Sequence, residues 1–300
     1  MLADKAIFRS ILFIDKSFAR ESDEHELKRQ FIRQSFHQRL IIFPHGAMIR
    51  WDQTPDDLWT RNWKLRDTEI GKNTVFLADT EQCATLYSAV WGITSLNCGT
   101  PRLQEWWLST LNHTPRHHRK PRILLVSGFF RGFDQGAHLD GIFSALQGMD
   151  IELIVRLHPR ETANAFRNKI GEKNWHRTHI RFSDTSVLHA ATDADIVICL
   201  PSTACLDAVV AEKPVIEYCD YDSIIDVSIQ FKRAGESSSF FGRFGIVETA
   251  ANSLQLTALV KDLLDPAIAR NRAEYQYQQL AKRSDLQQHA GESIKHLLED

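Results

Sequence analysis

Polar side chains follow four apolar runs in the second half of the chain, at the points where the runs end. Their types, which include hydroxyls, a histidine, an arginine and a carboxylate, are those that bind anions and hydroxyl groups. In chain order they are Gly128, Arg131, His158, Ser202, Thr203 and Glu217. If the runs are neighbouring parallel strands, about 4.8 Å apart, these groups meet at one edge of a sheet and can reach one small ligand.

The Ser202–Thr203 pair lies where an apolar run passes into a helical segment. Backbone N–H groups and the helix dipole at such a junction favour an anion, for example a diphosphate, and the two hydroxyls add donors. His158 would be a donor or a cation beside that anion. Each residue also has a plainer interpretation, in which Ser202 caps the helix and His158 belongs to a tight His-Pro turn. Their joint placement favours the binding interpretation.

Glu217 and the segment Gly128–Gly132 are less informative. The Glu217 carboxylate can accept hydrogen bonds from ribose hydroxyls, or it is a surface carboxylate at a strand end, and the sequence leaves both open. The glycine-containing loop lacks the G-x-G-x-x-G pattern, which argues against a dinucleotide oxidoreductase. No G-x-x-x-x-G-K-[ST] loop occurs in the chain, so a P-loop nucleotidase is not expected.

The elements that would position these residues alternate regularly after residue 120. Apolar runs predict parallel strands, and the segments between them have helical character, so we expect a parallel sheet with helices on both faces. The predicted strands are 121–128, 151–157, 179–182, 195–200, 214–218 and 245–248. The predicted helices are 135–147, 161–170 closed by Gly171, 186–194 capped by Asp184 or Thr185, 204–211, and a tail from 253 to the end, interrupted at Pro266.

The first half also alternates apolar runs with helical segments, but less regularly. Its predicted strands are 10–14, 40–43, 75–77 and 95–97, and its predicted helices are 24–34, 81–90 and 102–111. The polar segment 112–120, with a central proline, is the best linker candidate. We therefore expect two Rossmann-like domains, with an acceptor-side domain of residues 1–115 that looks short and a donor-binding domain of residues 116–300 that is the more regular.

One segment of the first half could supply a general base. His45 follows an apolar strand and precedes Gly46. A histidine in that loop could take the proton of an attacking acceptor hydroxyl. The alternatives are that His45 is a structural turn residue, or that a carboxylate of the next loop is the base. The carboxylates in that loop are Asp52, Asp56 and Asp57.

Composition excludes several classes of protein. The chain has 300 residues and a formal net charge of −2, so no overall field attracts nucleic acid. The five cysteines are odd in number and lack C-x-x-C spacing, which argues against a disulfide framework or a zinc knuckle and favours the cytosol. No D-x-D-like metal motif stands at a strand end, and we expect neither a metal nor a bound cofactor. No apolar stretch approaches the roughly 18 residues of a membrane span, and peripheral contact with the inner face of a membrane stays open.

Four segments in order carry a family resemblance: FPHGAM at 43–48, NCGTPR at 97–102, VRLHPRE at 155–161 and PSTACLDAVVAEKPVIEY at 201–218. The set resembles the GT-B superfamily of bacterial surface-polysaccharide enzymes, in particular CDP-glycerol glycerophosphotransferases and capsule transferases of the Kdo and sialic acid kinds. The resemblance implies that His45 assists the acceptor and that His158 and the hydroxyl pair hold the donor phosphate. Arg156 and Asp207 lie in the same segments, and we add them to the donor-binding set.

The sequence departs from the glycerophosphotransferase pattern in three places. It has His-Gly-Ala rather than His-Gly-Thr after residue 44, a Ser-Thr rather than a Ser-Ser pair at 202–203, and Leu-Pro rather than Asp-Tyr directly before that pair. The resemblance therefore favours a glycosyltransferase that moves a sugar from a CMP- or UDP-sugar to a surface-polysaccharide or glycolipid acceptor. The alternatives are a CDP-glycerol-type transferase on the same fold and a non-catalytic member that only binds a nucleotide or serves as a scaffold.

Overall fold

The computed structural model describes residues 11–15, 39–43, 74–91, 94–99, 108–109, 120–128, 135–177, 180–220 and 238–282. The chain divides into two compact units, with the division between Gln104 and Glu105. Each unit is described here by itself. The boundary expected from the sequence, at residue 115, lies outside the described residues.

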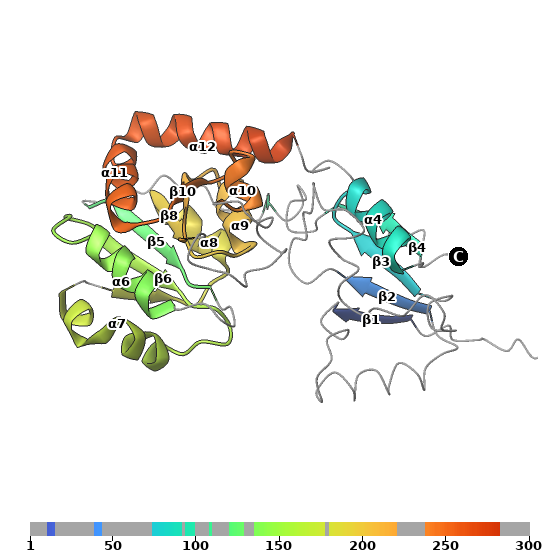
Figure 1. Cartoon of the computed structure of the whole chain (residues 1–300), viewed down its shortest axis with the longest axis horizontal. Helices are drawn as coiled ribbons and strands as arrows, with labels where there is room; N and C mark the ends of the chain where they lie inside the picture. The colour runs from blue at the N-terminus through green and yellow to red at the C-terminus, as the bar shows by residue number, and fades with distance from the viewer. Residues whose placement is uncertain are drawn as a thin grey trace, which may run out of the picture. The chain divides into compact units, whose positions relative to one another are not determined.

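The first unit contains a four-stranded parallel sheet (Figure 1). The strands lie side by side in chain order: β1 (Ile11–Asp15), β2 (Arg39–Phe43), β3 (Thr74–Ala78) and β4 (Thr94–Asn97). Helix α4 (Glu81–Trp91) joins the last two strands, and the Thr80 hydroxyl caps it by accepting a hydrogen bond from the Cys83 N–H at 3.1 Å. The four strands and this helix confirm the sequence prediction. The predicted helices 24–34 and 102–111 fall largely or wholly outside the described residues.

The second unit is built on a six-stranded, wholly parallel sheet. The strands are β5 (Arg122–Val126), β6 (Glu152–Arg156), β7 (Ile180–Ser183), β8 (Ile196–Cys199), β9 (Val215–Tyr218) and β10 (Glu248–Ala250). In space their order is β10-β9-β8-β5-β6-β7. Strands β5, β6, β8 and β9 are continuous apolar runs buried on both faces, as expected for a parallel sheet covered by helices.

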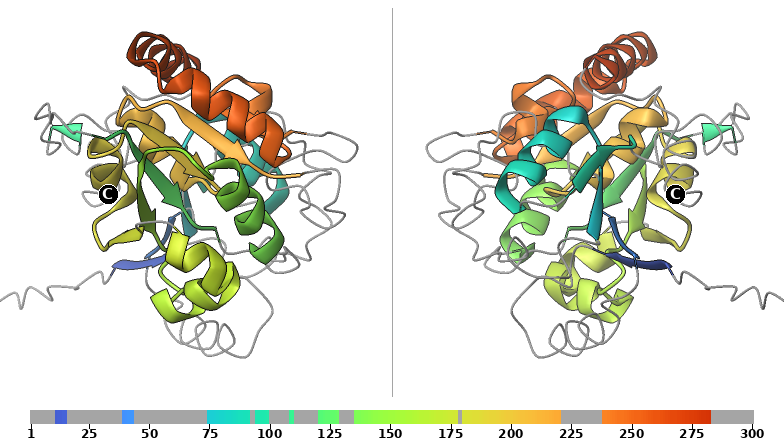
Figure 2. Two further views of the ribbon diagram at one scale, coloured as in Figure 1. Left: turned by 90° about the vertical axis from the view of Figure 1, so that its left-hand side faces the viewer. Right: turned by 90° about the vertical axis from the view of Figure 1, so that its right-hand side faces the viewer.

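Helices cover both faces of this sheet (Figure 2). On one face α6 (Gln135–Ala145) packs against α7 (Ala163–Arg177) and α11 (Ser253–Leu263). On the other face α9 (Ala204–Val210) packs against α8 (Val187–Thr192) and α12 (Pro266–Ala281). A Cβ at Gly141 of α6 would overlap the Tyr218 hydroxyl, so this glycine lets the helix lie directly over the end of β9.

Most predicted elements of this unit are confirmed, with four local differences. The helix predicted over 161–170 is closed by Gly171, whose backbone is non-helical (φ 70°, ψ 160°), but a second helical stretch that the sequence analysis did not predict follows directly and completes α7 to Arg177. In that stretch Trp175 stacks on Phe182 with ring centroids 6.0 Å apart. The cap of α8 is Ser186, whose hydroxyl accepts from the His189 N–H, and not Asp184 or Thr185.

The other two differences concern the region after residue 238. The sixth strand begins at Glu248, later than predicted, because the backbone N–H groups of Ile246 and Val247 bond back to the Phe241 carbonyl. That turn follows a short helix, α10 (Phe240–Arg243), which the sequence analysis did not predict. The predicted interruption at Pro266 is confirmed, since Asp265 caps α12 and Pro266 is its first residue.

A glutamine of α12 completes the sheet beside the first residue of β9. Gln276 is fully buried, and its side-chain amide donates to the Val215 carbonyl and accepts from the Val215 N–H, both at 2.8 Å. Strand β10 pairs with β9 only from Ile216 onward. The glutamine amide therefore takes the place of a strand partner for backbone groups that would otherwise be buried without one.

We expect the Gln276→Ala variant to lose on the order of 2–4 kcal/mol of unfolding free energy, because the N–H and C=O of Val215 lose their partners together. Urea unfolding followed by circular dichroism measures this. Gln278→Ala, an exposed change on the same helix, is the matched control and should cost less than about 0.5 kcal/mol. Equal losses in the two variants would contradict the assignment of Gln276 as a ladder partner.

Candidate donor-binding site

The strand order places a topological switch point between β5 and β8. The chain runs outward from β5 through β6 to β7, then returns to place β8 on the other side of β5. In open α/β sheets, ligands bind in the crevice beyond the carboxyl ends of the strands at such a switch. The loops that follow β5 and β8, at Gly128 and Ser202, border this crevice.

The register aligns the ends of the four central strands. Arg156 pairs with Val126, Val126 with Cys199, and Cys199 with Glu217. The loops after β5, β6 and β8 therefore leave the sheet at one level. Strands β6 and β8 are two steps apart, about 10 Å, so one nucleotide can reach the loops that contain His158 and Ser202.

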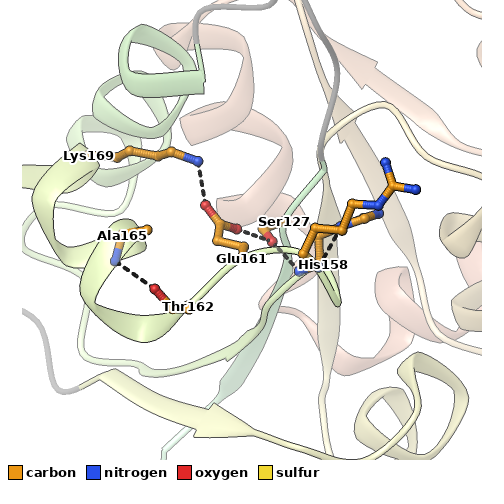
Figure 3. Close-up of polar contacts among 7 residues, drawn as sticks. Ser127, His158, Glu161, Thr162, Ala165 and Lys169 are labelled. Atoms are coloured by element: carbon orange, nitrogen blue, oxygen red, sulfur yellow. Dashed lines mark hydrogen bonds and ion pairs between the residues drawn. The ribbon is translucent and has the colours of Figure 1, made fainter. Parts of the chain in front are cut away.

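Three hydrogen bonds fix His158 in its turn (Figure 3). Its backbone N–H donates to the Ser127 hydroxyl at 2.7 Å, and its carbonyl accepts from the Glu161 N–H at 2.8 Å. Its ring Nδ1 accepts from the Arg160 N–H at 3.1 Å. A nitrogen that accepts from an amide bears no proton, so the neutral ring carries its proton on Nε2. The His-Pro turn and a ligand-binding role are thus compatible, because the turn determines which ring nitrogen donates.

The Ser202 hydroxyl contributes to capping α9, as the plainer interpretation predicts. It accepts from the Ala204 N–H at 3.2 Å. The N-cap position itself belongs to Thr203, whose hydroxyl makes no capping hydrogen bond and whose side chain is partly exposed. Ser202 therefore shapes the turn, while the Thr203 hydroxyl is not used for capping.

Arg156 is the last residue of β6 and lies partly buried. Its Nη1 donates to the Leu157 carbonyl at 2.7 Å, while its Nε is buried and has no hydrogen-bond partner among the described residues. A buried donor without a partner costs free energy, and a ligand anion at the strand ends would supply one.

The structure corrects the position of Glu217. It lies inside β9 rather than after it, with 1% of its surface exposed, because its backbone pairs with both Cys199 and Thr249. Burial raises the pKa of the Cys199 and Cys205 thiols well above the ordinary value, and the charges of Glu217 and Asp207 add to the rise. Glu217 and Asp207 are thus neighbours of a buried thiol pair. Their contact with a nucleotide stays a prediction.

Sequence reasoning missed Ser127, Glu161 and Lys169, which lie at the ends of β5 and the start of α7. Ser127 donates to the Glu161 carboxylate at 2.7 Å, and Lys169 donates to its other oxygen at 2.6 Å. The available sequence signal was that two polar residues stand at element ends, Ser127 at the end of a predicted strand and Glu161 at the start of a predicted helix. The sequence did not reveal that the two segments meet.

In the first unit, the rim of the sheet holds a buried carboxylate that sequence reasoning also missed. Asp79 follows β3 and is 2% exposed, near Cys98 at the end of β4. Burial raises the pKa of Cys98 to about 12, and Asp79 adds to the rise. His45, the competing bases Asp52, Asp56 and Asp57, and Arg131 of the second unit lie outside the described residues.

Within the part of the chain that the structure describes, no three His, Cys, Asp or Glu side chains gather as a metal site. In the same part, every helix is too short or too polar to cross a bilayer.

Both units have wholly parallel sheets, and the second has the strand order 3-2-1-4-5-6 about a switch point, which is the Rossmann-like fold that the sequence analysis predicts. Known structures share this fold at low sequence identity. The wall teichoic acid polymerase TagF matches with a TM-score of 0.53 and 10% identity over 97% of this chain and 90% of TagF. The UDP complex of MnaA from S. aureus matches with a TM-score of 0.53 and 14% identity over 88% and 70%.

A third similar structure, from Listeria monocytogenes, is provisionally described as a UDP-N-acetylglucosamine 2-epimerase. Its TM-score is 0.55 and its identity 16%, over 96% of this chain and 72% of that one. No family model and no curated protein matches the chain by sequence. At these identities the matches show the fold, and the reaction must be argued from the site.

The buried thiols predict how stability depends on pH. Folding holds Cys199 and Cys205 in their protonated form, whereas an unfolded chain loses these protons above pH ~8.5. Raising the pH above that value therefore lowers the unfolding free energy, by up to about 1.4 kcal/mol per pH unit for each thiol. Urea unfolding of the wild type and the Cys199→Ala/Cys205→Ala variant from pH 8 to 10 measures the difference, and the variant should have the shallower slope. Identical slopes would contradict the burial of the pair as ionisable thiols.

Proposed function

We propose that this chain is a GT-B-type transferase that moves a sugar from a nucleotide-sugar donor to a carbohydrate or glycolipid acceptor of a surface polysaccharide. The observation that carries the proposal is the switch point of the second sheet, bordered by the His158 turn and the Ser202–Thr203 turn. Both turns offer donors to an anion, and Arg156 adds a buried guanidinium with an unsatisfied N–H. A nucleotide diphosphate or monophosphate linked to a sugar has the charge and the length to use them together.

The similar structures support a nucleotide donor without defining it. The MnaA structure contains UDP, and glycosyltransferases such as CalG4 occur among the matched chains. The sequence resemblance adds CMP-sugars to the candidates. In the proposed reaction the acceptor hydroxyl attacks the donor sugar and the nucleotide leaves, so the groups at the switch point would stabilise the charge that builds on the leaving phosphate.

The residues named here act without a resident cofactor in this proposal. His45 would take the acceptor proton, and the nucleotide would be held by Gly128, Arg131, Arg156, His158, Ser202 and Thr203. A protein that moves a sugar to a surface-polysaccharide acceptor would work in the cytoplasm, at the inner face of the membrane, and we propose that location for this chain.

A transferase of CDP-glycerol type is the second candidate. It is favoured by the match to TagF, which covers nearly the whole of both chains, and by the order of the four short motifs. The reaction would differ in the group that moves, since an alcohol phosphate is transferred and CMP leaves. The same phosphate-binding groups would serve both reactions.

Donor profiling tests these proposals. The purified protein is incubated with CMP-, UDP- and GDP-sugars and CDP-glycerol, with and without an extract of glycolipid acceptors, and the released nucleotide and the sugar product are followed by mass spectrometry. Acceptor-dependent release of CMP or UDP from a sugar donor supports a glycosyltransferase, and release from CDP-glycerol supports the second candidate. Interconversion of a UDP-sugar without any acceptor would indicate an epimerase. Nucleotide binding without turnover would indicate a binding or scaffold protein.

We expect His158→Ala to lower kcat about 10²- to 10³-fold and to change donor affinity much less, because a donor aimed at the leaving phosphate matters most as charge develops there. Steady-state kinetics with the preferred donor measures both parameters. His189→Ala is the matched control, because the His189 ring bonds Ser186 within its own helix. A rise in KM alone for His158→Ala would mean that the histidine binds the ground state only.

A further inference from the structure

Ser127, Glu161 and Lys169 form a run of polar side-chain contacts that ends at the His158 turn (Figure 3). The Ser127 side chain is buried, and the Glu161 side chain is 2% exposed. The Ser127 hydroxyl donates to one Glu161 oxygen at 2.7 Å, and Lys169 donates to the other at 2.6 Å. Each of the three residues comes from a different part of the chain: the end of β5, the turn before α7, and the body of α7.

The chemistry of the groups fixes the direction of each hydrogen bond among Ser127, Glu161 and Lys169. An ionised carboxylate only accepts, so the Ser127 proton must point to Glu161. The hydroxyl lone pair that remains on the other side is the acceptor for the His158 N–H, at 2.7 Å. The ammonium of Lys169 compensates the carboxylate charge inside the fold, where an uncompensated charge would be strongly unfavourable.

Ser127 and Glu161 hold the backbone of His158 from two sides. Ser127 holds the backbone N–H of His158, and the Glu161 N–H holds its carbonyl at 2.8 Å. With both backbone groups fixed, the turn brings the Arg160 N–H within 3.1 Å of the ring Nδ1. The ring therefore keeps its proton on Nε2, the nitrogen that the proposed function assigns to the donor phosphate.

The turn does not need these side-chain contacts in order to fold. The same turn is already closed by its own backbone bond between His158 and Glu161, and Thr162 already caps α7 by accepting from the Ala165 N–H at 3.2 Å. Burial of a lysine–glutamate pair is a poor source of stability, because desolvation offsets most of the attraction. What the pair does supply is a fixed orientation for Ser127, and through it for His158.

We infer that Ser127, Glu161 and Lys169 are positioning residues, which set the place and the tautomer of His158 so that its Nε2–H donates to the donor phosphate. The inference rests on the proposed function for the identity of the ligand. The positioning itself is a property of the described contacts. None of the three residues is assigned to touch the substrate.

A double-mutant cycle tests whether Ser127 acts through His158. Ser127→Ala should lower kcat on the order of 10- to 100-fold, as small displacements of catalytic groups do. In the His158→Ala background the same change should have almost no further effect, because the group that it positions is gone. Multiplicative effects of the two substitutions would overturn the inference, since Ser127 would then act by another route.

Glutamate variants provide a graded version of the same test. Glu161→Gln keeps an oxygen that accepts from Ser127, whereas Glu161→Ala removes it. We expect Glu161→Gln to retain most of the turnover that Glu161→Ala loses. Equal activity in Glu161→Ala and the wild type would overturn the inference.

A spectroscopic readout separates positioning from stability and from the identity of the reaction. In protein labelled with ¹⁵N-histidine, the His158 ring, assigned by its loss in His158→Ala, should show the Nε2–H tautomer. Ser127→Ala should shift it to a mixture of tautomers. Gln276→Ala, which weakens the opposite end of the sheet, should lower the melting temperature and leave the tautomer and the affinity for CMP and UDP unchanged.

The outcomes for the function and for the inference are distinct. If the wild type binds neither CMP nor UDP and turns over no donor, the proposed function fails, and the tautomer measurement still decides whether Ser127 positions His158. If the wild type is active, His158→Ala is impaired, and Ser127→Ala keeps both wild-type kinetics and the Nε2–H tautomer, the function stands and the inference is overturned.

Discussion

The return of the chain from β7 to β8 is the constraint on which the candidate site depends. Because β8 pairs with the other side of β5, the switch in strand order lies between these two strands. The register then brings Arg156, Val126, Cys199 and Glu217 to one level across four strands. The turns proposed to bind the donor follow strands that end at that level.

The two turns that follow β6 and β8 are held in different ways. At the Ser202–Thr203 turn, one hydroxyl shapes the backbone and the other makes no capping hydrogen bond. At the His158 turn, Ser127 joins the backbone to the Glu161–Lys169 ion pair. We infer that this ion pair sets the orientation of the neutral His158 ring.

The sequence was sufficient for the fold of the second unit because its strands are long apolar runs separated by helical segments. The prediction from sequence failed where contacts between distant segments decide the structure rather than the local residue pattern. Gly171 closes a helix as predicted, but no local signal predicted the second helical stretch to Arg177, in which Trp175 stacks on Phe182. The sequence analysis allowed Glu217 to be a surface carboxylate at a strand end, but its backbone pairs with β8 on one side and β10 on the other, so it lies within β9. The Ser127–Glu161 contact joins residues 34 apart, and no local pattern announces it.

The glutamine of α12 also bears on the order of events during synthesis. The backbone N–H and C=O of Val215, the first residue of β9, find their partner only when Gln276, 61 positions later, is in place. A ribosome that has released the chain as far as β10 has supplied all six strands, but one end of β9 still lacks its hydrogen-bond partner. The second unit should therefore reach its final packing late in translation, after α12 has emerged, and until then the amino end of β9 is a place where a chaperone could bind.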